Sequence, residues 1–100
     1  MADPQFLENL QALVRDRLRE MPEDSYTARL AARGLIAVAQ KVGEEGVEVA
    51  LAAAAQDQEA LIGESADLLY HLLVLLELKQ VPLAAVIDEL QRRHRARSVR

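Results

Sequence analysis

The stretch from Lys41 to His71 constrains most strongly what this chain can fold into, because its acidic residues follow a helical spacing. Glu45 and Glu48 are three residues apart, and so are Glu64 and Asp67. On a helix, this spacing stacks two carboxylates on one face. Alanine, leucine and valine dominate between the acidic residues, so we expect two helices.

The relation between the two acidic pairs is more informative than either pair alone. If the two segments are antiparallel helices joined by a tight turn, residues at one level lie equally far from that turn. Glu48 with Glu64, and Glu45 with Asp67, are both centred on the polar stretch 56–58, which interrupts the apolar run and predicts a turn. The four carboxylates can therefore meet at one level of a helical hairpin.

Four carboxylates that face each other repel strongly unless a cation lies between them. Hard divalent cations prefer oxygen ligands, and Mg²⁺ is usual where a phosphate substrate supplies further ligands. The spacing thus predicts a metal site formed by Glu45, Glu48, Glu64 and Asp67. Two separate, solvated acidic faces are the alternative, and spacing alone leaves both interpretations open.

Composition limits the classes of protein to consider. One hundred residues, 51% of them apolar and 3% aromatic, with four glycines and three prolines, suit one small α-helical domain over residues 1–100. A net charge of −4 argues against general nucleic-acid binding. The chain has no cysteine, which excludes disulfides and thiolate metal sites.

The sequence contains no pattern typical of export or membrane insertion. Its N-terminus, MADPQF, lacks the basic and then apolar layout of a signal peptide. The longest apolar block, Leu68 to Leu76, is interrupted by His71 and is far shorter than the roughly 20 residues that span a bilayer. We therefore expect no membrane partner and a cytoplasmic location.

The apolar pattern divides the chain into helices and short connections. A first helix begins at Asp3-Pro4, an N-cap followed by proline, and ends near Glu20. A short helix starts at Ser25, and Gly34 marks a kink or a break after it. The remaining helices are expected over about residues 35–55, about 59–79 and from Pro82 onward. The predicted fold is all-α, with about five helices around a central antiparallel hairpin.

Two features of the hairpin suggest contacts beyond the single chain. The Leu68 to Leu76 block is apolar on every side and must be buried on every side, so we expect a subunit interface there. Gly43 and Gly46 flank the glutamates, which suggests that another helix or a substrate approaches the backbone closely.

Several segments resemble the phosphoribosyl-ATP pyrophosphatase family of histidine biosynthesis. This family is a branch of the all-α nucleoside triphosphate pyrophosphatases, which include the MazG and dimeric dUTPase families. The broader group is marked by EExxE followed by ExxD, which is met here by Glu44, Glu45, Glu48, Glu64 and Asp67. The segments SYTARL and DLLYHLLVLL narrow the resemblance to the phosphoribosyl-ATP enzymes, and it runs from about Ser25 to His94.

The resemblance implies Mg²⁺-dependent hydrolysis of phosphoribosyl-ATP to phosphoribosyl-AMP and pyrophosphate, the second step of histidine biosynthesis. It implies that Glu45, Glu48, Glu64 and Asp67 hold Mg²⁺, and that Glu44 supports either a second Mg²⁺ or the attacking water. Substrate contacts are expected from Ser25, Tyr26, Thr27, Arg29, Lys41 and His71. From the local pattern alone, Ser25 is also a plausible helix cap and His71 a core histidine held by one hydrogen bond.

The resemblance also implies an organisation and an assembly. Residues 1–24 would form an N-terminal helix and connection, residues 25–94 the family core, and residues 95–100 a basic tail, whose arginines suit a helix C-terminus. A homodimer or a dimer of dimers is expected. Relatives often carry a fused cyclohydrolase domain, for which this sequence has no residues. Two alternatives remain: a house-cleaning pyrophosphatase of the same fold acting on dUTP, dCTP or modified nucleotides, and a non-catalytic helical interaction module.

Overall fold

The fold consists of five helices with no strand in the part of the chain that is described. A computed structural model describes the backbone of residues 1–98 and the side chains of residues 1–95. The helices are α1 (Gln5–Glu20), α2 (Tyr26–Ala32), α3 (Leu35–Ala55), α4 (Gln58–Leu78) and α5 (Leu83–Ser98). This confirms the predicted all-α fold. Of the basic tail expected over residues 95–100, residues 95–98 end α5, and residues 99–100 lie outside the described residues.

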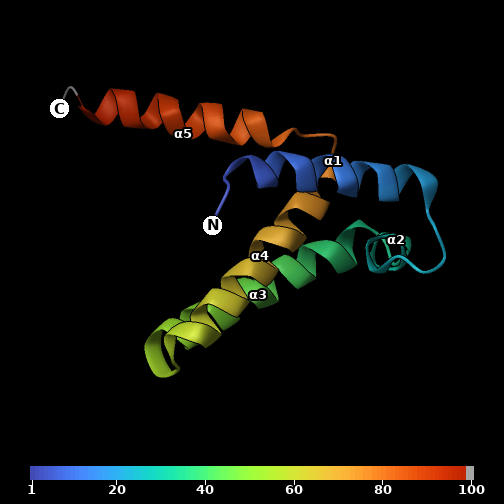
Figure 1. Ribbon diagram of the computed structural model, residues 1–100, viewed down its shortest axis with the longest axis horizontal. Coiled ribbons are helices and arrows are strands. Elements are labelled where there is room, and N and C mark those ends of the chain that lie inside the picture. The colour runs from blue at the N-terminus through green and yellow to red at the C-terminus, as the bar shows by residue number, and fades with distance from the viewer. Residues whose placement is uncertain (99–100) are drawn as a thin grey trace.

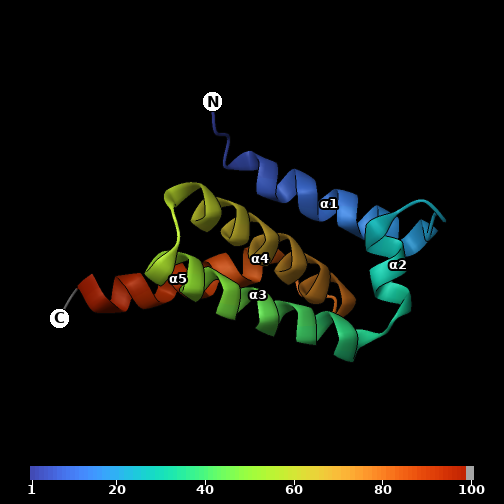
Figure 2. The ribbon, with the colours of Figure 1, turned by 90° about the horizontal axis from the view of Figure 1, so that it is seen from below.

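The central element is the antiparallel hairpin of α3 and α4, which lie side by side along most of their length (Figures 1 and 2). The connection is as short as the sequence predicts, because α3 ends at Ala55 and α4 begins at Gln58. Asp57 caps α4, and its carboxylate accepts a hydrogen bond from the backbone N–H of Ala60 at 2.8 Å. This tight turn fixes which residues of α3 and α4 face each other.

Helices α1 and α2 complete a small core on one side of the hairpin. Val14, Leu30, Val38 and Val74 form its centre, one from each of the first four helices, and none is more than 3% exposed. Gly34 allows α2 and α3 to meet at an angle, because its φ of +98° lies in a region that side chains other than glycine rarely adopt. The predicted break at Gly34 is confirmed.

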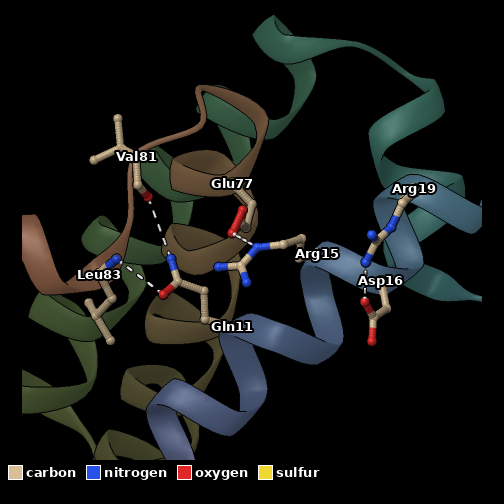
Figure 3. Close-up of polar contacts among 7 residues, drawn as sticks. All are labelled: Gln11, Arg15, Asp16, Arg19, Glu77, Val81 and Leu83. Carbon is tan, nitrogen blue, oxygen red and sulfur yellow. Dashed lines mark hydrogen bonds and ion pairs between the residues drawn. The ribbon is translucent and has the colours of Figure 1, made fainter.

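Polar contacts tie the connection between α4 and α5 to α1 (Figure 3). The Gln11 side-chain amide donates to the Val81 carbonyl at 3.5 Å and accepts from the Leu83 N–H at 3.1 Å. Next to it, the Arg15 guanidinium lies 2.9 Å from the Glu77 carboxylate. Gln11 is 6% exposed, so its amide replaces the water that would otherwise solvate this connection.

Helix α5 extends away from the rest of the molecule (Figure 1). The Cα radius of gyration is 15.2 Å, whereas a compact chain of this length is expected to have about 13 Å. No single helix of the described part is long and apolar enough to cross a membrane. Helices α4 and α5 meet that test only as a pair, by length and composition, and they are bent by 109°.

The leucine block of α4 is only partly buried within the chain. Leu73 and Val74 are 2% and 0% exposed, because α1 and α3 pack against α4. Leu69, one helical turn before Leu73, is 48% exposed. The apolar pattern predicts burial on every side, and within the block the chain leaves Leu69 in particular exposed.

Candidate metal centre

The structure brings together three of the four predicted metal ligands. Glu45 and Glu48 project from α3 and Glu64 from α4, and one carboxylate oxygen of each lies within 4.8 Å of the others. The sequence spacing predicts these residues at one level of the hairpin, and the short turn between α3 and α4 places them there. Asp67 does not join this group, although it lies close enough for its charge to act on both Glu45 and Glu64.

Two carboxylate oxygens at this site are buried without a hydrogen-bond partner, namely Oε2 of Glu45 and Oε2 of Glu64. Glu45 as a whole is only 5% exposed. A buried acceptor that has lost its water costs free energy unless a donor or a cation replaces that water. The atoms that could bind a metal here are all carboxylate oxygens and carry negative charge, so they fit a hard divalent cation.

Without a cation, the neighbouring carboxylates oppose each other's ionisation. Burial, followed by the adjacent Glu48 carboxyl, raises the pKa of Glu45 above its ordinary value of 4.5. The Glu48 carboxyl, placed to share a proton with Glu64, is the largest cause of the raised pKa of Glu64, followed by burial. Once both groups are ionised, neither has a proton to share, and a cation would relieve the repulsion.

His71 lies directly behind the cluster and is 5% exposed. Its Nδ1 is 2.9 Å from the backbone oxygen of Asp67 and 3.3 Å from Oε1 of Glu45. Its Nε2 is 2.8 Å from the Tyr26 hydroxyl. Both ring nitrogens therefore already have protein partners. The alternative expectation, a core histidine held by one hydrogen bond, is not met, because both ring nitrogens are hydrogen-bonded. Substrate binding by His71 stays a prediction.

The segment that begins at Ser25 is docked onto α4. Ser25 caps α2, because its hydroxyl accepts from the Ala28 N–H at 3.1 Å. Thr27 is 5% exposed and its hydroxyl is hydrogen-bonded to that of Tyr70, while Tyr26 reaches His71 from the same helix. The hydroxyls predicted to meet substrate phosphates thus have structural partners here. Tyr70 was missed by the sequence argument, although it stands within the segment DLLYH.

The predicted cationic and water-activating residues surround the cluster but do not enter it. Glu44 is exposed and accepts a hydrogen bond from the Gln40 amide at 3.3 Å. Lys41 is half-buried, one helical turn before Glu45 on α3. Arg29 is exposed, with Nη1 3.5 Å from the carbonyl oxygen of Glu23.

A cavity of about 220 Å³ opens between α1, α2 and α4, beside Tyr26 and Thr27. It adds one cation that the sequence argument did not consider, Arg17 of α1. A larger hollow of about 400 Å³ lies between α1 and the connection that follows α4. The arginines of that larger hollow are paired with acidic residues, as Figure 3 shows.

Gly43 and Gly46 have open space around them. A Cβ atom built at either residue meets nothing within 4 Å. Helix packing inside the chain therefore does not account for them. Their surroundings leave room for the expected approach of a substrate or of another subunit.

An all-α chain in which carboxylates meet across a helical hairpin has the arrangement expected of the all-α nucleoside triphosphate pyrophosphatases. The model of one family, described as phosphoribosyl-ATP pyrophosphohydrolase, matches residues 7–94. The chain belongs to this family.

Named relatives agree with the family match. The phosphoribosyl-ATP pyrophosphatase of Metallosphaera sedula is 54% identical over 87% of this chain and 94% of its own length. That of Novosphingobium aromaticivorans is 50% identical over 93% of this chain and 87% of its own length. The histidine biosynthesis bifunctional protein HisIE of Xylella fastidiosa is 55% identical over 94% of this chain, which spans 46% of that longer protein.

Proposed function

We propose that this chain hydrolyses phosphoribosyl-ATP to phosphoribosyl-AMP and pyrophosphate, in the second step of histidine biosynthesis. The observation that carries the proposal is the cluster of Glu45, Glu48 and Glu64, in which two buried carboxylate oxygens lack any partner. Membership of the phosphoribosyl-ATP pyrophosphohydrolase family supplies the substrate.

The cluster is the proposed Mg²⁺ site, with Asp67 as the predicted fourth ligand. When bound, Mg²⁺ would neutralise the triphosphate and lower the pKa of a bound water. The carboxylates of Glu45 and Glu64 hold the cation only after they lose the protons that their raised pKa values favour. Metal binding therefore releases protons and strengthens as pH rises.

Glu44 is proposed to act at the solvent side of the cluster. It is four residues before Glu48 and therefore shares that residue's face of α3. Its exposed carboxylate is accessible either to an attacking water or to a second Mg²⁺. Both roles suit a carboxylate that lies outside the cluster of Glu45, Glu48 and Glu64.

The triphosphate needs positive partners that the carboxylates cannot supply. Lys41 and Arg29 are proposed for this role, because one precedes the cluster by a turn on α3 and the other is exposed on α2. The proposed contacts of Ser25 and Thr27 are weaker candidates, since their hydroxyls cap α2 and bind Tyr70.

A homodimer or a dimer of dimers is proposed as the working assembly. The hairpin carries exposed apolar side chains on the sides of α3 and α4 away from the core. These are Ile36 (83% exposed), Val47 (60%), Leu51 (55%), Ile62 (62%) and Leu69 (48%). We call them the hairpin apolar face. The open surroundings of Gly43 and Gly46 would let a second copy's helix approach closely.

A substrate panel tests the proposed activity. Pyrophosphate release would be measured with phosphoribosyl-ATP, dUTP and dCTP at equal concentration, and the nucleotide product identified by mass. We expect phosphoribosyl-ATP to be the preferred substrate and phosphoribosyl-AMP its product. Preference for dUTP or dCTP would instead assign a house-cleaning pyrophosphatase, and no release from any of them a non-catalytic module.

A further inference from the structure

We propose that Tyr26 and His71 form a positioning relay for Glu45, which holds one oxygen of that carboxylate and leaves the other to bind a cation. The inference rests on the proposed metal site and adds to it. It gives His71 a role behind the cluster instead of a contact with substrate.

The hydrogen on Nδ1 of His71 can be assigned from its neighbours. A backbone carbonyl oxygen only accepts hydrogen bonds, and that of Asp67 is 2.9 Å from Nδ1. Oε1 of Glu45, 3.3 Å from the same nitrogen, is also an acceptor when ionised. Nδ1 therefore carries the hydrogen and donates it to the Asp67 carbonyl, while Oε1 of Glu45 lies 3.3 Å from the same N–H group.

Tyr26 fixes this form of the ring from the other side. With the hydrogen on Nδ1, Nε2 of a neutral imidazole is an acceptor, and the Tyr26 hydroxyl donates to it at 2.8 Å. In the other tautomer, the Nδ1 lone pair would face two acceptor oxygens. The rings of Tyr26 and Tyr70 meet the imidazole edge to face, at 74° and 82°, and limit its rotation.

The result is a carboxylate with two unlike oxygens. Oε1 of Glu45 faces the imidazole, whereas Oε2 is buried without a partner. Groups that orient a metal ligand in this way typically change metal affinity by about 10- to 100-fold when removed. A carboxylate that could rotate would have to be fixed again each time a cation binds, which weakens binding.

The test measures Mn²⁺ affinity of the full chain by electron paramagnetic resonance, with Mn²⁺ as a spectroscopic substitute for Mg²⁺. Tyr26→Phe removes the donor to Nε2 and should raise the dissociation constant roughly 2- to 10-fold. His71→Ala should raise it about 10- to 100-fold. His71→Asn keeps an N–H near the position of Nδ1 and should restore most of the affinity.

Tyr70→Phe is the matched control. It also removes a hydrogen bond between α2 and α4, in this case with Thr27, but does not touch the polar atoms of His71. Its Mn²⁺ affinity should equal that of the unsubstituted chain. Circular dichroism would establish that each variant is folded, and if His71→Ala is not, the two tyrosine variants decide the question alone.

The possible failures can be told apart. Equal Mn²⁺ affinities for Tyr26→Phe and Tyr70→Phe would overturn the relay, as would a His71→Asn variant no better than a folded His71→Ala. In both cases, normal binding by the unsubstituted chain would leave the metal site standing. If the unsubstituted chain bound no Mn²⁺, the metal site and the relay would both be overturned.

Discussion

At the scale of single residues, the site is a set of carboxylates whose charges destabilise the fold that holds them. Glu45 and Glu64 both have raised pKa values, because burial and the adjacent Glu48 disfavour their ionised forms. A group whose pKa is higher in the folded than in the unfolded state stabilises the fold only while it is protonated. At neutral pH, the ionised carboxylates of Glu45 and Glu64 therefore lower the stability of the metal-free fold, and the same negative charge favours binding of a cation.

The repulsion between these carboxylates predicts how pH affects the stability of the metal-free protein. The stabilisation from the Glu64 carboxyl is complete below its ordinary pKa of 4.5 and is lost as pH rises through the raised folded value. Glu64→Gln removes one of the opposing charges. We therefore expect metal-free Glu64→Gln to melt at a higher temperature than the unsubstituted chain at pH 8, with the difference shrinking towards pH 4.

Mg²⁺ should reverse that ranking, because it stabilises only a site that can bind it. Thermal melts with and without Mg²⁺ at pH 8 measure both effects. An equal rise in melting temperature for both proteins would mean that Glu64 is not a ligand.

The sequence predicted these residues to different degrees. Glu48 and Glu64 could be paired because a tight turn places residues at one level when they are equally far from residue 56. The partners of His71 could not be predicted in this way. Its contact with Tyr26 joins residues 45 positions apart and depends on how α2 docks onto α4. Asp67 shows the limit of counting, because the spacing fixes its level but not where its side chain points.

At the scale of elements, α2 connects α1 to the hairpin that carries the carboxylate cluster. Seven residues long, α2 is too short to be stable alone, so its position depends on the contacts of Tyr26 and Thr27 with α4. The boundaries of α3 and the break at Gly34 followed from apolar periodicity and turn residues. The angle between α2 and α4 depends on packing between distant segments, which no local pattern encodes.

The positions of Arg29 on α2 and Lys41 on α3 predict that these two basic side chains contact the phosphates of the substrate. Arg29→Ala and Lys41→Ala should each lower kcat/KM for phosphoribosyl-ATP by roughly one to two orders of magnitude, because each removes one charge-assisted contact to a phosphate. Mn²⁺ affinity should not fall, since neither residue belongs to the carboxylate cluster. Steady-state kinetics and metal titration measure the two effects separately.

Arg93→Ala on α5 is the control, since this arginine is exposed and pairs with Glu89 on its own helix. If Arg29→Ala behaved like Arg93→Ala, the segment beginning at Ser25 would serve only to build and dock α2.

At the scale of the whole molecule, the chain leaves much of its apolar surface uncovered. Seven apolar side chains are buried among the described residues, although 51% of the sequence is apolar. Helix α5 and the hairpin apolar face supply surface that a second copy would cover. The sequence predicted an interface from the leucine block, but the most exposed of the hairpin's apolar residues lie on α3 and near the start of α4.

Assembly can be tested at the hairpin apolar face. We expect the unsubstituted chain to scatter light as a dimer or larger at micromolar concentration, with an interface well above the roughly 1,000 Å² of a biological contact. Leu51→Glu should shift it towards the monomer, because it buries a charge at the interface. Phe6→Glu is the control, since Phe6 is 58% exposed but lies on α1. A monodisperse unsubstituted monomer would contradict the proposal.

The proposed Mg²⁺-dependent hydrolysis is tested by pyrophosphate release from phosphoribosyl-ATP as a function of Mg²⁺ concentration, for the unsubstituted chain and for Glu48→Gln. Glu48 is chosen because it neighbours both other carboxylates of the cluster. We expect release to require Mg²⁺, and a folded Glu48→Gln variant to release pyrophosphate only at the background rate. Unchanged release by Glu48→Gln, or release by the unsubstituted chain in the presence of excess chelator, would contradict it.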